Sequence, residues 1–316
     1  MRTAVRRCYL LILGLLLSAC VSAPQTMQLT QQVPAVLDSP INLDHVPFFP
    51  QEDYQCGPAA LATVLGNTAI NVIPDELVSQ VYIPARRGSL QIEMLATARR
   101  YGRVPYVLSG SLAEMLEEVG NGRPVLVMQN LGLNRLPQWH YAVVVGYDLS
   151  RREIRLRSGT IRDYVISLSL FEKTWARADH WAVVVLEPGQ LPQYADETAY
   201  FQQVADFEIS NAGDSVLLAW QAGLERWPSS RLMSMGLSNQ LYAQGQTPAA
   251  AEVLQDLLKS DSNFAAAHNN LAWLLSQLGN VDAAITHARQ AVQLAPDNEA
   301  FQATLAALQS NISSGK

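Results

Sequence analysis

The sequence predicts an α+β domain followed by an all-α domain of helical repeats. Three observations predict this fold class. Between residues 41 and 187, helical periodicity comes first and β-branched strand patterns follow, which favours α+β over an alternating parallel sheet. A stretch containing Pro and Gly at residues 187–192 then breaks the pattern. After this stretch every segment has helical character, and an internal repeat appears.

Composition excludes several classes of protein. The chain has 316 residues, of which 49% are hydrophobic and 16% charged, with a formal net charge of −6. It is therefore too apolar to be mostly disordered and long enough for two domains. Without a block of Lys and Arg it lacks the basic surface typical of nucleic-acid-binding proteins. Its three cysteines, Cys8, Cys20 and Cys56, cannot form a disulfide framework.

Residues 1–19 have the pattern of an export signal. Three arginines among the first seven residues precede an apolar run at residues 10–17, which is too short to span a bilayer. Leu17-Ser18-Ala19-Cys20 resembles the bacterial lipobox. This resemblance implies cleavage before Cys20 and lipidation of its thiol. Val21 and Ser22, with no Asp after the cysteine, resemble lipoproteins sorted to the outer membrane, which implies a place at its periplasmic face. The alternative is an ordinary secretory signal that is cut near Ala23.

Residues 20–40 are rich in Gln, Pro, Ser and Thr, and they predict a flexible lipidated tether. Cleavage would remove Cys8, and lipidation would convert the Cys20 sulfur into a thioether. Cys56 would then be a lone thiol in an oxidising compartment, where it must be buried or used.

The α+β domain is predicted over residues 41–187. Apolar residues at helical spacing predict helices at 59–65, 89–100 and 111–119, and Ser111 with Glu114 resembles a capping box at the start of the third. Strands are predicted from β-branched content at 124–128, 141–147, 153–157 and 181–186.

After a linker at 188–199, residues 200–312 are predicted to form the helical domain. Gly245 and Gly279 are 34 residues apart, and Leu237 matches Leu271 at the same offset. Residues 272–297 resemble the tetratricopeptide repeat, with a second repeat at 230–263 and a degenerate one at 200–229. The resemblance implies stacked helical hairpins that bind peptides or protein segments. The alternative is a generic Ala-rich helical bundle.

Cys56 carries the strongest chemical signal. Pro58 is typical of the first turn of a helix, so Cys56 is predicted at a helix N-terminus. There the helix dipole and free N–H groups are expected to lower the pKa of the thiol and make it a nucleophile. The side-chain amide of Gln51, five residues upstream, can donate to an oxyanion together with the Cys56 backbone N–H. Glu52 and Asp53 are predicted to be solvated loop charges.

A thiol nucleophile needs a base, and two histidines are candidates. His140 and His180 each begin a predicted strand and have similar neighbours. The remaining three histidines lie before the Cys56 loop or within the repeats. The residues alone do not rank the two candidates.

The motifs Gln51-x4-Cys-Gly-Pro-Ala-Ala-Leu and Trp-His140-Tyr-Ala-Val-Val-Val-Gly-Tyr-Asp resemble a known enzyme family. Residues 41–187 are similar to the papain-like cysteine peptidases that process double-glycine bacteriocin leaders, peptidase family C39, and in particular to their stand-alone exported relatives. This resemblance implies a papain-like fold with Cys56 as nucleophile, His140 as base and Gln51 as oxyanion donor. His180 would then be structural.

The sequence departs from this family at the third catalytic position. The family places Asp on the strand after the histidine, whereas here Ser158 occupies that position. A neutral orienting group is chemically acceptable, because it mainly holds the ring and its tautomer. Ser158 is expected to accept a hydrogen bond from Nδ1 of His140. Asp148 and Asp163 are the alternative orienting residues.

The predicted function is therefore that of an exported, lipid-anchored cysteine peptidase that hydrolyses amide bonds through a thioester. Acyl transfer to an amine is an alternative outcome, and a catalytically inactive peptide-binding scaffold is an alternative function. No Cys/His cluster has metal-ligand spacing and no phosphate-binding loop is present, so no metal, cofactor or nucleotide is expected. The expected partners are a peptide or protein substrate and a protein bound by the repeats.

Overall fold

The computed structural model describes residues 23–51 and 55–313, with side chains described as far as residue 310. The predicted signal peptide, the lipidation site Cys20 and the loop acids Glu52 and Asp53 lie outside these residues. Two compact units are present, Met1–Met94 with Val107–Val185 and Leu95–Tyr106 with Leu186–Lys316. Among the described residues, no helix combines the length and apolarity that a membrane span requires.

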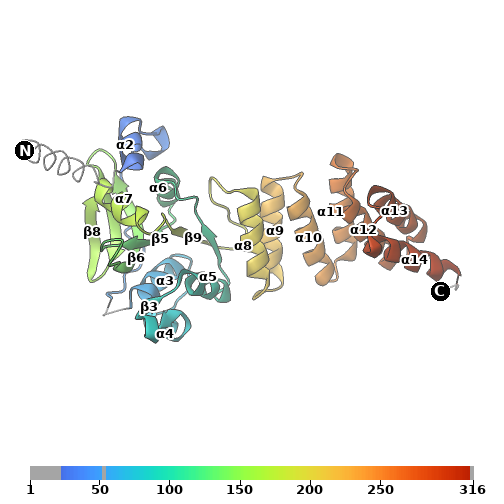
Figure 1. The fold of residues 1–316 in the computed structure, drawn as a ribbon, viewed down its shortest axis with the longest axis horizontal. Helices are drawn as coiled ribbons and strands as arrows, with labels where there is room; N and C mark the ends of the chain where they lie inside the picture. Colours follow the sequence, from blue (N-terminus) through green and yellow to red (C-terminus); the bar gives the residue numbers. More distant parts are fainter. Residues whose placement is uncertain (1–22, 52–54, 314–316) are drawn as a thin grey trace, which may run out of the picture. The chain divides into compact units, whose positions relative to one another are not determined.

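A seven-stranded sheet forms the centre of the N-terminal fold (Figure 1). Its order is β4-β9-β5-β6-β7-β8, and β1 also pairs with β6. The pairs β1–β6, β5–β6, β5–β9, β6–β7 and β7–β8 are antiparallel, which confirms the predicted α+β class. The strands are β1 (Ile41–Asn42), β4 (Val104–Val107), β5 (Val125–Asn130), β6 (Trp139–Asp148), β7 (Glu153–Ser158), β8 (Ile161–Ser167) and β9 (Ala182–Leu186).

The helices before and around the sheet include all three that the sequence predicts. They are α2 (Pro24–Gln31), α3 (Cys56–Asn67), α4 (Pro74–Val81), α5 (Gln91–Arg100), α6 (Leu112–Gly120) and α7 (Leu168–Ala176), with short 3-10 helices at Ala35–Leu37 and Pro84–Arg86. A two-stranded ribbon, β2 (Tyr82–Ile83) with β3 (Gly88–Ser89), stands apart from the main sheet. Local sequence pattern did not predict α2, α4, α7, β1, β2, β3, β4 or β8.

The start of α6 forms half of the predicted capping box. The hydroxyl of Ser111 accepts from the Glu114 backbone N–H at 3.3 Å, as expected for a helix N-cap. The Glu114 carboxylate, however, does not return to Ser111. It accepts from the backbone N–H and the hydroxyl of Ser109 instead.

The prediction of a flexible tether is wrong for residues 24–37. The Glu172 carboxylate on α7 accepts from the backbone N–H groups of Gln25 at 2.9 Å and Thr26 at 2.6 Å, the otherwise unpaired donors at the start of α2. The side chain of Gln25 also bonds the backbone of Gly110 and Leu112. This segment is therefore a folded part of the N-terminal unit.

The C-terminal unit contains the predicted helical hairpins. Its helices are α8 (Glu197–Glu208), α9 (Asp214–Arg226), α10 (Arg231–Ala243), α11 (Thr247–Ser260), α12 (Ala265–Gln277), α13 (Val281–Leu294) and α14 (Glu299–Ser313). Gly245 and Gly279 have φ of +76° and +79° in the turns after α10 and α12. Glycine adopts this conformation without the penalty that other residues have, which explains why the 34-residue repeat retains glycine at this position.

The predicted domain boundary differs from the observed one at residues 95–106. Leu95–Tyr106 group with the helical repeats and not with the rest of the predicted α+β domain. Within that unit, Arg99 forms an ion pair with Asp206 of α8 at 2.8 Å, and its backbone carbonyl accepts from the Asn211 side chain. These long-range pairings cannot be recognised from the local pattern of residues 89–100.

Candidate active site

Helix α3 begins at Cys56, where the sequence predicts it, and Pro58 occupies its first turn. The thiol is half-buried and free of any disulfide. The next residue, Gly57, faces Ser89 of β3 so closely that a Cβ there would lie 2.2 Å from the Ser89 hydroxyl oxygen. The glycine after the cysteine is therefore required by close packing at this end of the helix.

Burial raises the pKa of the Cys56 thiol above its ordinary value of 9.0. Hydrogen bonds from the backbone N–H groups of Tyr141, Gly57 and Cys56 itself oppose this shift by stabilising the thiolate. The expectation that the helix start lowers the pKa is therefore wrong in its net direction. The helix N–H groups act as predicted, but loss of solvation outweighs them.

His140 lies on β6, and its imidazole Nε2 is 2.8 Å from the Ser158 hydroxyl oxygen at the end of β7. The two strands are neighbours in the sheet, with Val143 opposite Arg157. The hydrogen bond predicted at Nδ1 therefore lies at Nε2 in the structure. When Nε2 carries the ring proton it donates to Ser158, and Nδ1 keeps its lone pair.

The protonation state of His140 suits a general base. Burial lowers the pKa of its imidazole below the ordinary value of 6.5, because the charged form loses solvation. At neutral pH the ring is therefore uncharged and able to accept a proton. Among the described residues, the group at hydrogen-bond distance from the ring is the neutral hydroxyl of Ser158 and not a carboxylate.

Tyr141 is a site residue that sequence reasoning missed. Its backbone N–H stabilises the Cys56 thiolate and so holds the pKa of that thiol down, which places the residue beside His140 close to the candidate nucleophile. Its buried side-chain hydroxyl donates to the Ser89 carbonyl at 3.3 Å, which links β6 to the ribbon against Gly57. Burial and the nearby Cys56 raise the pKa of the Tyr141 phenol. Its position directly after His140 was the available signal.

Gln51 lies at the same end of β7 as Ser158. Its backbone N–H donates to the carbonyl of Gly159 at 3.0 Å, one residue beyond Ser158, and its side chain is half-buried. The fold therefore brings the loop carrying Gln51 to the strand end that carries the orienting hydroxyl. These contacts connect the three separate segments of the sequence that carry Gln51 with Cys56, His140 and Ser158.

The alternative base His180 and the alternative orienting residues Asp148 and Asp163 contact other groups. His180 lies in the turn before β9 with φ of +52°, and its ring packs edge-on against Trp175 at 4.7 Å between centroids. The Asp163 carboxylate pairs with Arg157 at 2.6 Å. Asp148 accepts from the Ser150 hydroxyl at 2.6 Å, a bond that holds the pKa of its carboxyl below the usual value. Neither carboxylate is bonded to His140.

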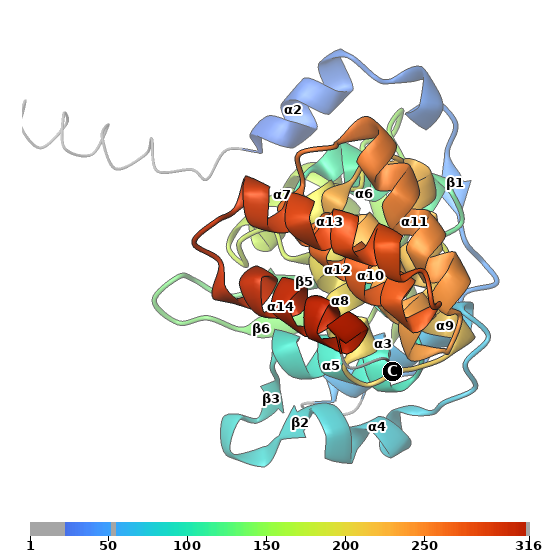
Figure 2. The same ribbon diagram turned by 90° about the vertical axis from the view of Figure 1, so that its right-hand side faces the viewer.

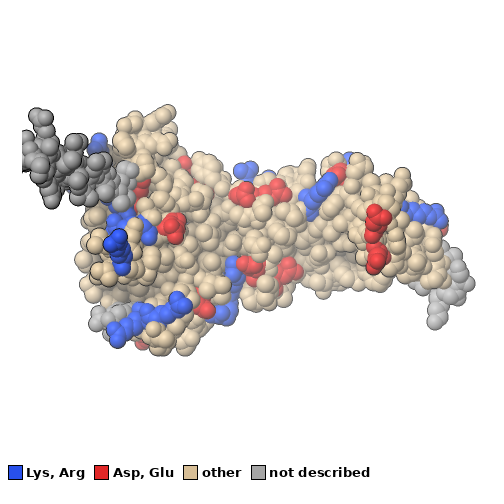
Figure 3. Space-filling view, in the orientation of Figure 1, with Lys and Arg blue, Asp and Glu red and all other residues tan. Residues whose placement is uncertain are grey.

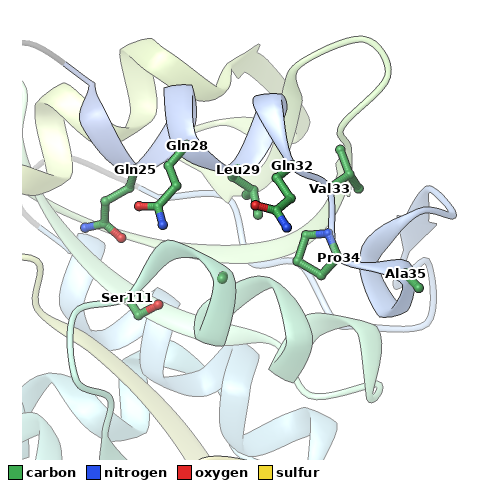
Figure 4. Close-up of a pocket in the computed structure, with 9 residues that line it drawn as sticks. Gln25, Gln28, Leu29, Gln32, Val33, Pro34, Ala35 and Ser111 are labelled. Carbon is green, nitrogen blue, oxygen red and sulfur yellow. The ribbon is translucent and has the colours of Figure 1, made fainter.

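A hollow of about 550 Å³ elsewhere on the N-terminal unit contains none of these residues. It lies where α2 approaches α6 (Figure 4). Its walls are largely uncharged and rich in amide side chains, consisting of Gln25, Gln28, Leu29, Gln32, Val33, Pro34, Ala35, Ser111 and Ala113. Within the described part of the chain, no three His, Cys, Asp or Glu side chains are placed to hold a metal ion.

Comparison with known proteins agrees with the division of the chain into an α+β part and a helical-repeat part. Residues 43–182 match the Peptidase C39-like family, and residues 235–299 match the tetratricopeptide repeat. No curated protein matches the chain.

Several solved structures are similar to parts of the chain. A C39-like peptidase from Bacillus anthracis has 19% identity and a TM-score of 0.41, and the match covers 48% of this chain and 98% of the other. The type III secretion chaperone SycD of Yersinia enterocolitica, solved with a peptide of the translocator YopD, has 16% identity and a TM-score of 0.34, covering 38% and 98%. The first tetratricopeptide domain of human RPAP3 has 10% identity and a TM-score of 0.35, covering 37% and 93%. By its family matches, the chain combines an α+β Peptidase C39-like domain with a C-terminal region of tetratricopeptide repeats.

Proposed function

We propose that the N-terminal unit is a cysteine peptidase in which Cys56 is the nucleophile and His140 the general base. The observation that carries the proposal is the 2.8 Å contact between His140 Nε2 and Ser158, beside Tyr141, whose backbone N–H stabilises the Cys56 thiolate. It supports an imidazole held in one orientation at the start of the cysteine-bearing helix. This is the arrangement that nucleophilic catalysis by a thiol requires.

In the proposed reaction, Nδ1 of His140 takes the Cys56 proton as the sulfur attacks the substrate carbonyl carbon. The resulting oxyanion accepts from the Cys56 backbone N–H and from the Gln51 side-chain amide. The imidazolium then returns the proton to the leaving amine, and a thioester remains. Water, deprotonated by His140, attacks the thioester carbonyl, and collapse of that intermediate releases the acid and restores the thiol.

Ser158 acts in this scheme as a positioning residue. Its hydroxyl accepts from Nε2–H and so keeps the lone pair on Nδ1, where the thiol proton is received. A neutral hydroxyl stabilises the imidazolium less than the carboxylate usual in the family. Together with the raised pKa of Cys56, this favours a resting state of neutral thiol and neutral imidazole over a preformed ion pair.

The test uses the chain from Val21 onward, which retains every described residue. We expect iodoacetamide at neutral pH to label Cys56, and His140→Ala to slow the labelling, whereas His180→Ala is the matched control and leaves it unchanged. A Cys56→Ala variant expressed in cells should retain bound substrate that the active chain releases as cleaved product. Product masses separate hydrolysis from transfer to an amine. Unlabelled Cys56 in folded protein would refute the proposal.

A second function is favoured by one specific observation: among the described residues, the group bonded to His140 is a neutral hydroxyl and not a carboxylate. In that case the unit is a catalytically inactive peptide-binding scaffold. Capture of the same proteins by the wild-type chain and by Cys56→Ala, without cleavage by either, would favour this function.

The proposal also covers where the protein is located in the cell and how it recruits a substrate or partner protein. The lipobox-like residues support lipid attachment at Cys20 and a place in the cell envelope, and radiolabelled palmitate should mark the wild-type chain but not Cys20→Ala. The helical repeats support recruitment of a substrate or partner protein, because such repeats present an extended binding surface. Deletion of the repeats should then lower turnover of a protein substrate more than turnover of a short peptide.

A further inference from the structure

The loop that joins β5 to β6, residues 131–138, exposes large apolar side chains. Together with Trp139 at the start of β6, the exposed side chains form what we term the apolar tip, and their exposed fractions are 51% for Leu131, 70% for Leu133, 74% for Leu136 and 54% for Trp139. Figure 2 shows this loop projecting away from the sheet. Contiguous exposure of this kind marks an interaction site in a soluble protein.

Hydrogen bonds hold the apolar tip in one conformation. Leu133 and Leu136 exchange two backbone hydrogen bonds, of 3.2 and 3.0 Å. The Asn130 side-chain oxygen accepts from the backbone N–H groups of Gly132 at 3.0 Å and Gln138 at 2.9 Å. A Cβ at Gly132 would lie 2.4 Å from the Leu136 carbonyl oxygen, so the turn is closely packed. The leucines are therefore displayed by an ordered hairpin.

From these features we propose that the apolar tip inserts into the surface of a lipid bilayer. A stable protein interface buries roughly 800 Å² on each partner over a complementary surface. A projecting turn is too narrow for that, whereas acyl chains are fluid and need no complementary shape. The order along the hairpin also fits a bilayer, with Leu133 and Leu136 in the turn and Trp139 at its base, because tryptophan favours the level of the headgroups.

The charge around the apolar tip also favours its insertion into a lipid bilayer. Residues 129–147 contain no Asp or Glu, and their one charged side chain is the exposed Arg135. At the base of the hairpin, the Arg177 guanidinium donates two hydrogen bonds to the Asn130 carbonyl, at 2.9 and 3.0 Å. On the face of the N-terminal unit in Figure 3, residues other than Lys, Arg, Asp and Glu cover most of the surface. Cations beside an apolar turn suit anionic headgroups.

The position of α2 agrees with an orientation in which the apolar tip faces the membrane. In Figure 2, α2 begins on the side of the unit toward which the hairpin projects. Because Glu172 holds the first turn of α2, only residues 21–23 would separate the folded unit from a lipid on Cys20. Such an anchor would hold this side of the unit against the membrane. This anchor depends on the proposed lipidation, whereas insertion of the apolar tip does not.

The test measures flotation of the chain from Val21 onward, which lacks Cys20, with vesicles of phosphatidylethanolamine and phosphatidylglycerol. We expect the chain to float with the vesicles and Leu133→Ser/Leu136→Ser to lower its partition coefficient about tenfold or more. Val36→Ser/Ile92→Ser is the matched control, because these side chains are 64% and 66% exposed in the same unit. This control should bind like wild type. Unfolding midpoints verify that each variant is folded.

Depth is measured by quenching of tryptophan fluorescence with brominated acyl chains. Trp139→Phe should remain bound and lose much of the quenching. The proposal is overturned if the wild-type chain does not float, or if the control pair loses binding as much as the leucine pair. It is also overturned if the leucine pair floats like wild type. If wild-type chains do not float and the leucine pair slows peptide cleavage, the tip is a substrate contact instead. Labelling of Cys56 tests the peptidase proposal separately.

Discussion

Replacement of Ser158 by Asp tests how the candidate base is held. A carboxylate in place of the hydroxyl would lie within hydrogen-bond distance of Nε2, where the present contact is 2.8 Å. An opposite charge this close favours the imidazolium and raises a histidine pKa by about 1–3 units. At about 1.4 kcal/mol per unit, the imidazolium gains about 1–4 kcal/mol of stability relative to the neutral ring. Ser158→Asp should therefore reverse the lowering of the His140 pKa.

The assay is an NMR titration of the His140 ring in wild type, Ser158→Asp and Ser158→Asn. Asn matches Asp in size but has no charge, so it should leave the pKa near the wild-type value. A higher pKa in the Asp variant should also increase labelling of Cys56 near neutral pH, because the imidazolium stabilises the thiolate. Equal pKa values in the Asp and Asn variants would refute the assignment of Ser158 as the group that orients His140.

Three further predictions follow from contacts in the N-terminal unit. Gly57→Ala should lower the free energy of unfolding measured in urea by about 1–3 kcal/mol. Ser89→Gly should restore most of that loss, since it removes the atoms that a new Cβ meets. Additive effects of the two substitutions on the free energy of unfolding would contradict the close contact. Glu172→Ala should speed amide hydrogen exchange throughout α2, because two backbone donors lose their carboxylate, and unchanged exchange would show that α2 docks by other means. Turnover should fall with acidity only below pH 6.5, because burial lowers the His140 pKa and the neutral ring is the base, whereas a fall beginning above pH 6.5 would contradict this.

Local pattern was sufficient to predict much of the N-terminal unit. The start of α3 at Cys56 follows from Pro58, whose missing N–H is harmless only in a first helical turn. The strands β5, β6, β7 and β9 follow from β-branched runs that are buried in the sheet. Strand β8 was missed because nearly all of its side chains are exposed, so it has no alternating pattern to detect.

The remaining differences arise from contacts between residues distant in sequence. The segment at residues 24–37 has the composition of a linker, and it folds because Glu172, 146 residues from Thr26, accepts from the start of α2. The direction of the Cys56 pKa depends on how much of the fold covers the thiol, which no local motif encodes. Likewise, which nitrogen of His140 meets Ser158 depends on the rotation of a ring between two strands.

The central claim is that His140 activates Cys56 from a neutral resting pair, and the pH dependence of iodoacetamide labelling tests it most directly. Burial raises the pKa of Cys56 above 9.0 and lowers that of His140 below 6.5. The labelling rate of the substrate-free chain should therefore keep rising through pH 9, and cleavage of an identified substrate should require both side chains. A labelling rate that is constant from pH 5 to pH 8 would indicate a preformed thiolate–imidazolium pair. Cleavage that survives Cys56→Ala would contradict the claim itself.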